Sequence, residues 1–352
     1  MDSSYYLLKE ADEEHNISYV YLDVYCRRST GAMGDFKHKD LFYSWYNTDY
    51  MKMSINKLSF IFSMSEPDSY VDSLLPFTRY RYQVFDTAHI REQLEDKRKQ
   101  EYRYTNIDEQ GNITEYQDKG YYYTDVEMDS RYLLRELSPL DQKPMTKDAE
   151  KYLRKIIEYC KENEIELTIF SAPFYELHAM EMQRYDNYVE QVREIATEYN
   201  LSYYDFNLCK EEYLPIQKNQ YFMNVGHLNN QGAELFTGFL YDVVEGNVNA
   251  EDCFWESYEE KLANSEPAIY GLLYEEGDAE RKFVVASNRA DGLEYKLTLI
   301  ETAENGEISE NVLQDYSENK EFVLEKGRNG ICRIEARKMG EAESFQVLEV
   351  EY

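Results

Sequence analysis

The chain has 352 residues, of which 69 are acidic and 38 are basic, so its formal net charge at pH 7 is −31. A hydrophobic fraction of 43% excludes a disordered chain, and the length allows two domains at roughly 150 residues each. The acidity argues against nucleic acid or an anionic membrane surface as a partner, because both select clustered lysine and arginine, and the dense basic run at 97–99 is flanked by acids.

The cysteine content predicts neither a disulfide framework nor a zinc site. An odd number of widely separated cysteines without a CxxC pair favours buried thiols. The cysteines are Cys26, Cys160, Cys209, Cys253 and Cys332. We expect no metal and no cofactor, and the N-terminal residues show neither an export signal nor a membrane span. Compartment and oligomeric state stay open.

The first part of the chain predicts a helix, a strand and a long insertion. Residues 3–14 have the periodicity of an amphipathic helix. Residues 17–25 are rich in β-branched and aromatic side chains, which predicts a strand covered on both faces. We interpret 26–144 as an insertion containing a helix near 86–103 and a turn at 108–112. Within it, GYYYTDVEMDSRYL fits either a short strand or an ordered loop.

After Pro144, helices and strands alternate. A capped helix follows Thr146, residues 166–173 form a buried strand, 181–200 a second amphipathic helix, and 201–206 another strand. Such alternation predicts an α/β domain with a doubly wound parallel sheet in three layers, with functional loops at the carboxyl ends of the strands.

The last part of the chain has a different pattern. Short β-rich runs separated by turns with glycine, asparagine or aspartate predict a β-sandwich domain over 268–352. Residues 251–267 are then a connector, and 1–250 are the α/β domain.

Two strand ends of the α/β part carry polar and aromatic side chains. Asp205 and Asn207 follow one strand, and the other ends in the predicted substrate-binding residues Ser171, Phe174, Tyr175 and Glu176. Ser171 lacks the glycines of a nucleophile elbow, so we interpret it as a small residue that fits the sheet. The nearby His178 is interpreted as a helix-cap or surface residue.

The strongest chemical signal is His227 in NVGHLNNQGAELFTGFL, just before a helix that starts near Asn230. An imidazole on a loop at the mouth of an α/β sheet can transfer protons. Asn224, three residues earlier, is placed to orient the ring, and Asn229 is placed to contact a substrate.

The block HLNNQGAELFTGFL resembles the H-L-N-x-x-G-A-x-x-F block of SGNH/GDSL hydrolases. SYYLLKEA, ISYVYLDVY and TIFSAPFYE extend the resemblance, over about residues 1–245, to a bacterial branch related to the D-alanyl teichoic acid transfer protein and exopolysaccharide O-acetylation proteins. It implies that His227 is a general base and that the substrate is an acylated cell-surface carbohydrate, outside the cytoplasm.

Two positions depart from the family pattern. Asn224 stands where the family has an orienting aspartate, and an amide adds no charge to stabilise an imidazolium; Asp205 is a substitute if its loop reaches His227. The family serine follows a strand ahead of the helix that residues 1–14 resemble, so the resemblance implies that this chain lacks it.

Three functional hypotheses therefore stay open. One is an SGNH-type esterase or O-acyltransferase that is truncated or catalytically impaired as this chain. The second is a non-catalytic glycan- or protein-binding pseudoenzyme. The third assigns the function to the β-sandwich as a carbohydrate-binding module.

Overall fold

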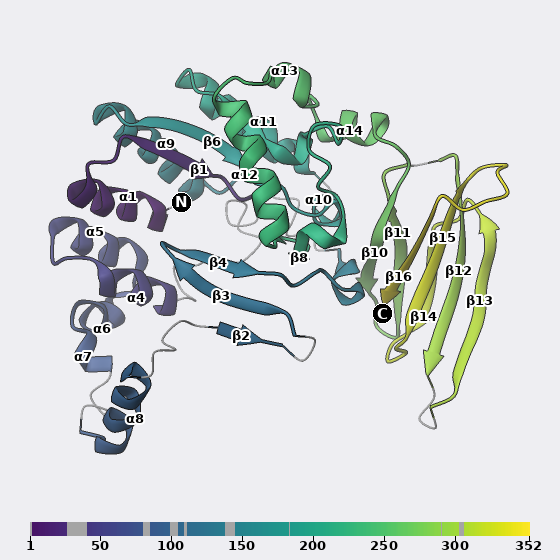
Figure 1. Cartoon of the computed structure of the whole chain (residues 1–352), viewed down its shortest axis with the longest axis horizontal. Helices are drawn as coiled ribbons and strands as arrows, with labels where there is room; N and C mark the ends of the chain where they lie inside the picture. Colours follow the sequence, from purple (N-terminus) through teal and green to yellow (C-terminus); the bar gives the residue numbers. More distant parts are fainter. Residues whose placement is uncertain are drawn as a thin grey trace.

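The computed structural model shows a mixed α/β protein, which confirms the predicted α/β class at this level. The part of the chain that it describes contains a parallel sheet and several antiparallel sheets (Figure 1). It describes residues 2–26, 41–79, 85–98, 105–108, 111–137, 145–182, 184–289, 291–302 and 306–352. The turns predicted at 108–112, 289–292 and 303–307 lie partly outside these ranges.

The parallel sheet has three strands in the order β1-β6-β7. They are β1 (Tyr19–Asp23), β6 (Glu166–Ser171) and β7 (Tyr203–Asp205). The central strand β6 is the buried one, and it pairs with both neighbours in parallel register. The prediction that the first strand is covered on both faces is wrong, because β1 lies at the edge and Tyr21 is 48% exposed.

Helices cover both faces of this sheet. Ile169 of β6 shares a buried cluster with the apolar residues of two helices, whereas the ring of Phe170 lies 5.9 Å from the ring of Phe236 on a third helix. Successive strand residues point to opposite faces, so the first two helices and the third lie on opposite sides. They are α9 (Lys147–Glu162), α11 (Tyr185–Glu198) and α12 (Asn230–Val244).

The segment predicted as an insertion forms helices and a small antiparallel sheet. Its helices are α4 (Leu41–Tyr50), α5 (Ile55–Met64), α6 (Tyr70–Leu74), α7 (Pro76–Arg79) and α8 (Thr87–Arg98), and its sheet contains β2 (Thr105–Ile107), β3 (Ile113–Asp118) and β4 (Tyr121–Thr124). The N-terminal helix α1 (Asp2–His15) contacts α5, since Asn56 Nδ2 donates to Tyr6 O at 2.9 Å.

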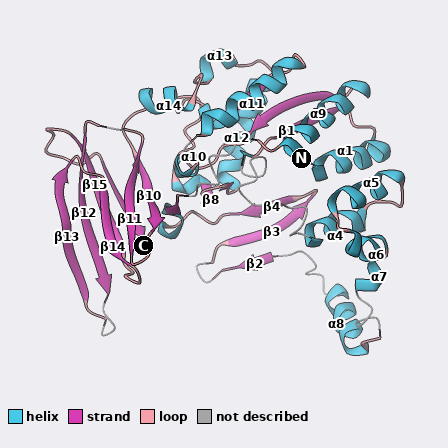
Figure 2. Cartoon of the chain, turned by 180° about the vertical axis from the view of Figure 1, so that it is seen from behind, coloured by secondary structure: helices cyan, strands magenta, loops and turns pink. Residues whose placement is uncertain are grey.

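Two four-stranded sheets make up the C-terminal part, in the orders β14-β11-β10-β5 and β13-β12-β15-β16 (Figure 2). Their strands are β5 (Leu134–Glu136), β10 (Ile269–Glu276), β11 (Glu280–Ser287), β12 (Leu293–Thr302), β13 (Ile308–Ser317), β14 (Glu321–Glu325), β15 (Ile331–Lys338) and β16 (Gln346–Glu351). Strand β5, from the predicted insertion, pairs in parallel with β10. One cluster of buried side chains runs from α12 into both sheets.

The connector is helical. It contains α13 (Ala250–Cys253) and α14 (Tyr258–Asn264). Asp186 of α11 accepts the backbone N–H groups of Tyr258 and Glu259 at 2.6 and 3.1 Å, so α14 is tied to the α/β part at its first turn.

Candidate functional site

His227 lies on a short hairpin next to the N-terminus of α12. The hairpin pairs β8 (Phe222–Asn224) with β9 (His227–Leu228), and Asn224 stands opposite His227. The turn of the hairpin is joined to the start of the short helix α10 (Glu176–Glu181), because Tyr175 N donates to Val225 O at 2.9 Å. His227 is exposed.

The residues after His227 start α12. Asn229 is the N-cap, and its Oδ1 accepts the N–H of Gly232 at 3.0 Å. Its Nδ2 donates to Val126 O and Gln220 O. A Cβ on Gly232 would lie 2.1 Å from Tyr221 O, so only glycine fits there. Asn229 is 1% exposed, so its side chain stabilises the hairpin and the first turn of α12 from inside the fold.

Asn224 fixes the tautomer of His227. Its Oδ1 accepts the backbone N–H of Gly226 at 3.0 Å; because a backbone N–H only donates, the facing side-chain atom is the oxygen. His227 Nδ1 lies 2.9 Å from the same oxygen, so Nδ1 carries the proton. In a neutral imidazole Nε2 is then the unprotonated nitrogen, as in the histidine of a Ser–His–Asp triad. The amide therefore selects the tautomer that leaves Nε2 unprotonated, and it supplies no charge.

Asp205 is held in another network. Its Oδ2 accepts from Tyr185 Oη at 2.7 Å, and its Oδ1 accepts from the Asn207 N–H and Nδ2 at 3.0 and 2.9 Å. Burial raises the pKa of Asp205, against the lowering effect of these hydrogen bonds. The structure thus ties Asp205 to Tyr185 and Asn207 at the end of β7, and the orienting atom on His227 Nδ1 is Asn224 Oδ1.

Ser171 and the aromatic residues after it are buried at the carboxyl end of the central strand β6. Ser171 Oγ donates to Val24 O at 2.9 Å and lies 2.7 Å from Tyr203 Oη. Phe174 and Tyr175 are 3% and 4% exposed. The structure therefore places these side chains in the packed interior of the α/β part.

Glu176 forms a buried ion pair across to the connector. Lys261 Nζ lies 2.5 Å from Glu176 Oε2 and donates to Asn207 O at 2.7 Å. Both ionic side chains are buried. A buried charge is retained only when it is paired in this way, so this pair joins α10 to α14.

The interpretation of His178 as a helix-cap or surface residue is wrong, because His178 is 2% exposed. Its Nε2 lies 2.9 Å from Tyr25 Oη, and its Nδ1 lies 2.6 Å from Glu181 Oε1. Arg135 of β5 donates to Glu181 Oε2 at 2.6 Å. The pattern H-x-x-E, which puts both side chains on one helix face, is the sequence signal for this chain of contacts.

Tyr25 connects this chain to the His227 hairpin. A Cβ built on Gly226 would lie 3.2 Å from Tyr25 Oη and 3.8 Å from Asn224 Oδ1. The glycine therefore lets the tyrosine hydroxyl approach the backbone between Asn224 and His227. The contacts of His178 and those of His227 therefore come together at Gly226.

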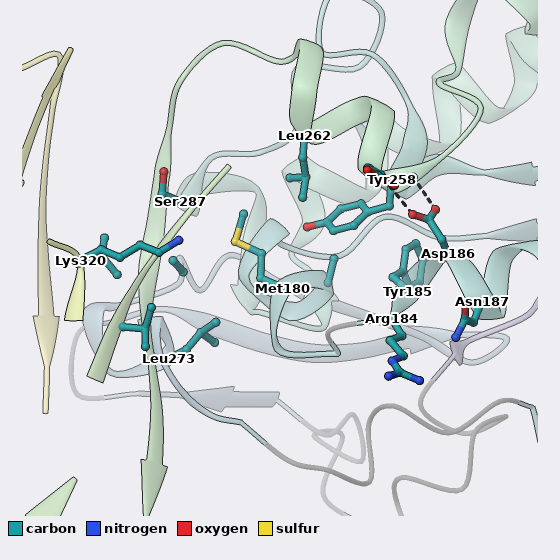
Figure 3. Close-up of a pocket in the computed structure, with 15 residues that line it drawn as sticks. Met180, Arg184, Tyr185, Asp186, Asn187, Tyr258, Leu262, Leu273, Ser287 and Lys320 are labelled. Carbon is teal, nitrogen blue, oxygen red and sulfur yellow. Dashed lines mark hydrogen bonds between the residues drawn. The ribbon is translucent and has the colours of Figure 1, made fainter. Parts of the chain in front are cut away.

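A separate cavity of about 600 Å³ lies between α10, α11 and α14 on one side and the β10–β11 strands on the other (Figure 3). The Tyr258 side chain projects into it, with its hydroxyl toward Met180. Burial raises the pKa of Tyr258 well above its usual value. No residue of the His227 hairpin lines this cavity.

The five cysteines are buried and unpaired, as predicted. In the ranges that the structure describes, no group of three histidine, cysteine or acidic side chains is arranged to hold a metal ion. No helix within those ranges combines the length and the apolar character needed to cross a bilayer.

Comparisons with protein-family models, curated proteins and solved structures give no match to this chain.

Proposed function

We propose that this protein is related to SGNH/GDSL-type esterases and O-acyltransferases, and that it acts on acyl esters of a cell-surface carbohydrate with His227 as general base. One observation carries the proposal: Asn224 Oδ1 accepts from both Gly226 N–H and His227 Nδ1. This arrangement leaves Nε2 as the nitrogen that takes a proton from an attacking hydroxyl.

The arrangement of secondary structure supports the same proposal. The histidine stands beside the first turn of a helix that covers the parallel sheet β1-β6-β7, where ligand-binding loops of α/β proteins gather. We propose an SGNH-like three-layer fold for this part and a β-sandwich for the C-terminal sheets.

The missing charge at Asn224 favours a second candidate, a non-catalytic domain that binds glycan or protein. In serine proteases, replacing the orienting aspartate by asparagine lowers kcat by about 10⁴-fold. A protein with such a loss keeps an exposed, hydrogen-bonding histidine, which is suited to binding.

Ester hydrolysis by the purified chain separates the two candidates. Wild type, His227→Ala and Asn224→Asp are compared with p-nitrophenyl acetate and with an O-acetylated polysaccharide. His15→Ala is the matched control, since His15 is an exposed histidine at the end of α1. We expect His227→Ala to lose on the order of 10²-fold or more and Asn224→Asp to gain on the order of tenfold or more.

Turnover that does not depend on His227 contradicts the catalytic proposal. Polysaccharide binding that changes with His227→Ala in the absence of turnover supports the binding domain instead.

A further inference from the structure

We propose that Tyr25 is a nucleophile of this protein, with His178 as its base and Glu181 as the group that orients the base, and that it takes the acyl group of an ester. The inference rests on the proposed function for its substrate class and for the His227 base of its second step. The three side chains come from the end of β1 and from α10.

The contacts have the order of a nucleophile, a base and an orienting carboxylate. Tyr25 Oη lies 2.9 Å from His178 Nε2, and His178 Nδ1 lies 2.6 Å from Glu181 Oε1. A nucleophile within hydrogen-bond reach of a base, with the base oriented by a third group, is the general signature of covalent catalysis, and tyrosine is among the residues that form such intermediates.

The charge on Glu181 sets the direction of the hydrogen bonds. Burial raises the pKa of this carboxyl, but the hydrogen bonds from His178 and Arg135 outweigh burial and hold the pKa at about 2. Glu181 is therefore ionised at neutral pH, and its Oε1 lies 2.6 Å from His178 Nδ1.

Arg135 already balances the charge of Glu181. In the proposed reaction His178 acts as a neutral imidazole, and its Nε2, 2.9 Å from Tyr25 Oη, takes the hydroxyl proton.

The position of Tyr25 relates it to the His227 hairpin. Its hydroxyl lies beside Gly226, where the Cβ of any other residue would be 3.2 Å away. Tyr25 is half-buried, while His178 and Glu181 are fully enclosed. Tyr25 is thus the member of this chain of contacts that is partly exposed.

The proposed reaction has two steps. Tyr25 Oη attacks the acyl carbonyl carbon, its proton passes to His178 Nε2, and the alcohol leaves after taking that proton, so that an acyl-tyrosine forms. Water then attacks the acyl carbon and gives a proton to His227 Nε2, the Tyr25 oxygen leaves and takes up the proton that His227 releases, and a carboxylic acid is released.

The test is to find the acyl group on Tyr25. The full chain is incubated with p-nitrophenyl acetate, quenched with acid, digested and analysed by mass spectrometry. We expect an acetyl group on Tyr25 in the wild type, at least tenfold less in His178→Gln, and more in His227→Ala because release is slowed. Tyr25→Phe keeps the ring beside His178 and removes the label, and its fold is checked by circular dichroism.

Tyr21 is the matched control. It is an exposed tyrosine two residues inside the same strand end, and Tyr21→Phe should leave Tyr25 labelling and ester turnover unchanged. Absence of acetyl-Tyr25 in both wild type and His227→Ala overturns the inference, as does labelling of Tyr25 no faster than that of Tyr21. If His178→Gln does not fold, the comparison of Tyr25 with Tyr21 still decides.

The two proposals fail separately. Turnover that does not depend on His227 contradicts the proposed function. The mass-spectrometric position of the acetyl group tests the role of Tyr25, and it can be determined at any rate of turnover.

Discussion

Glu181→Gln should remove a pH-dependent part of the stability of this protein. The Glu181 side chain is 0% exposed and its pKa is held at about 2, against a usual value of 4.5. This lowering of the pKa corresponds to about 3 kcal/mol in the free energy of unfolding. Because the folded-state pKa is lowered, this contribution is present above about pH 4.5 and is lost as the pH falls toward 2.

Urea unfolding followed by circular dichroism, at several pH values from 5 to 2, measures this contribution. The difference in unfolding free energy between wild type and Glu181→Gln should shrink by about 3 kcal/mol over that range. Glu276→Gln is the control, since Glu276 also forms ion pairs, with Arg281 and Lys326, but at the surface, where ion pairs contribute little. If the difference in unfolding free energy between the wild type and Glu181→Gln is the same at all pH values, Glu181 is not an ionised, paired carboxylate in the folded protein.

Three further predictions concern the support of the site. On α12, the new methyl group of Gly232→Ala would clash with Tyr221 O, so this variant should unfold at a clearly lower urea concentration than the wild type. Gly238 has open space around it, so Gly238→Ala should raise the free energy of unfolding by up to about 1 kcal/mol. Equal urea midpoints for the two variants contradict this. Lys261→Met leaves the Glu176 carboxylate buried without its cation and should cost about 3–5 kcal/mol in the same assay, so an unchanged midpoint refutes the buried pair. The five buried cysteines, for three of which burial raises the thiol pKa to about 11 or 12, should resist a thiol reagent at neutral pH until the protein is denatured; rapid labelling of the folded protein would be inconsistent with this packing.

Periodicity predicted the regular elements well. The helix after Thr146 and the helix starting near Asn230 lie within a residue or two of α9 and α12, because both have strong caps and an apolar stripe. Strand β13 was not predicted. Its side chains are mostly exposed, since it is an edge strand, so the alternation that marks a half-buried strand is absent.

The pairing of strands that lie far apart in the chain could not be predicted from the sequence. Nothing in the short run that forms β5 indicates that it pairs with β10, more than a hundred residues later, because register depends on which surfaces meet in three dimensions. The pairing places Arg135 against Glu181, and so determines the charge state of the buried carboxylate.

The candidate site was predicted in part. The spacing of Asn224 and His227 indicated their contact, and the structure adds the role of Gly226, whose N–H orients the amide. The partners of His178 could not be predicted, since Tyr25 and Arg135 reach it from distant segments. Periodicity does not distinguish a buried histidine from an exposed one on a short helix.

The central claim is that Asn224 holds His227 with a proton on Nδ1 and none on Nε2. Nitrogen-15 NMR of histidine-labelled protein tests it directly, with the His227 signals assigned by their loss in His227→Gln. At a pH where the ring is neutral, the account predicts a protonated-type shift at Nδ1 and an unprotonated-type shift at Nε2, and both should move toward the average of the two tautomers in Asn224→Ala. A proton found on Nε2 in the wild type would contradict the account.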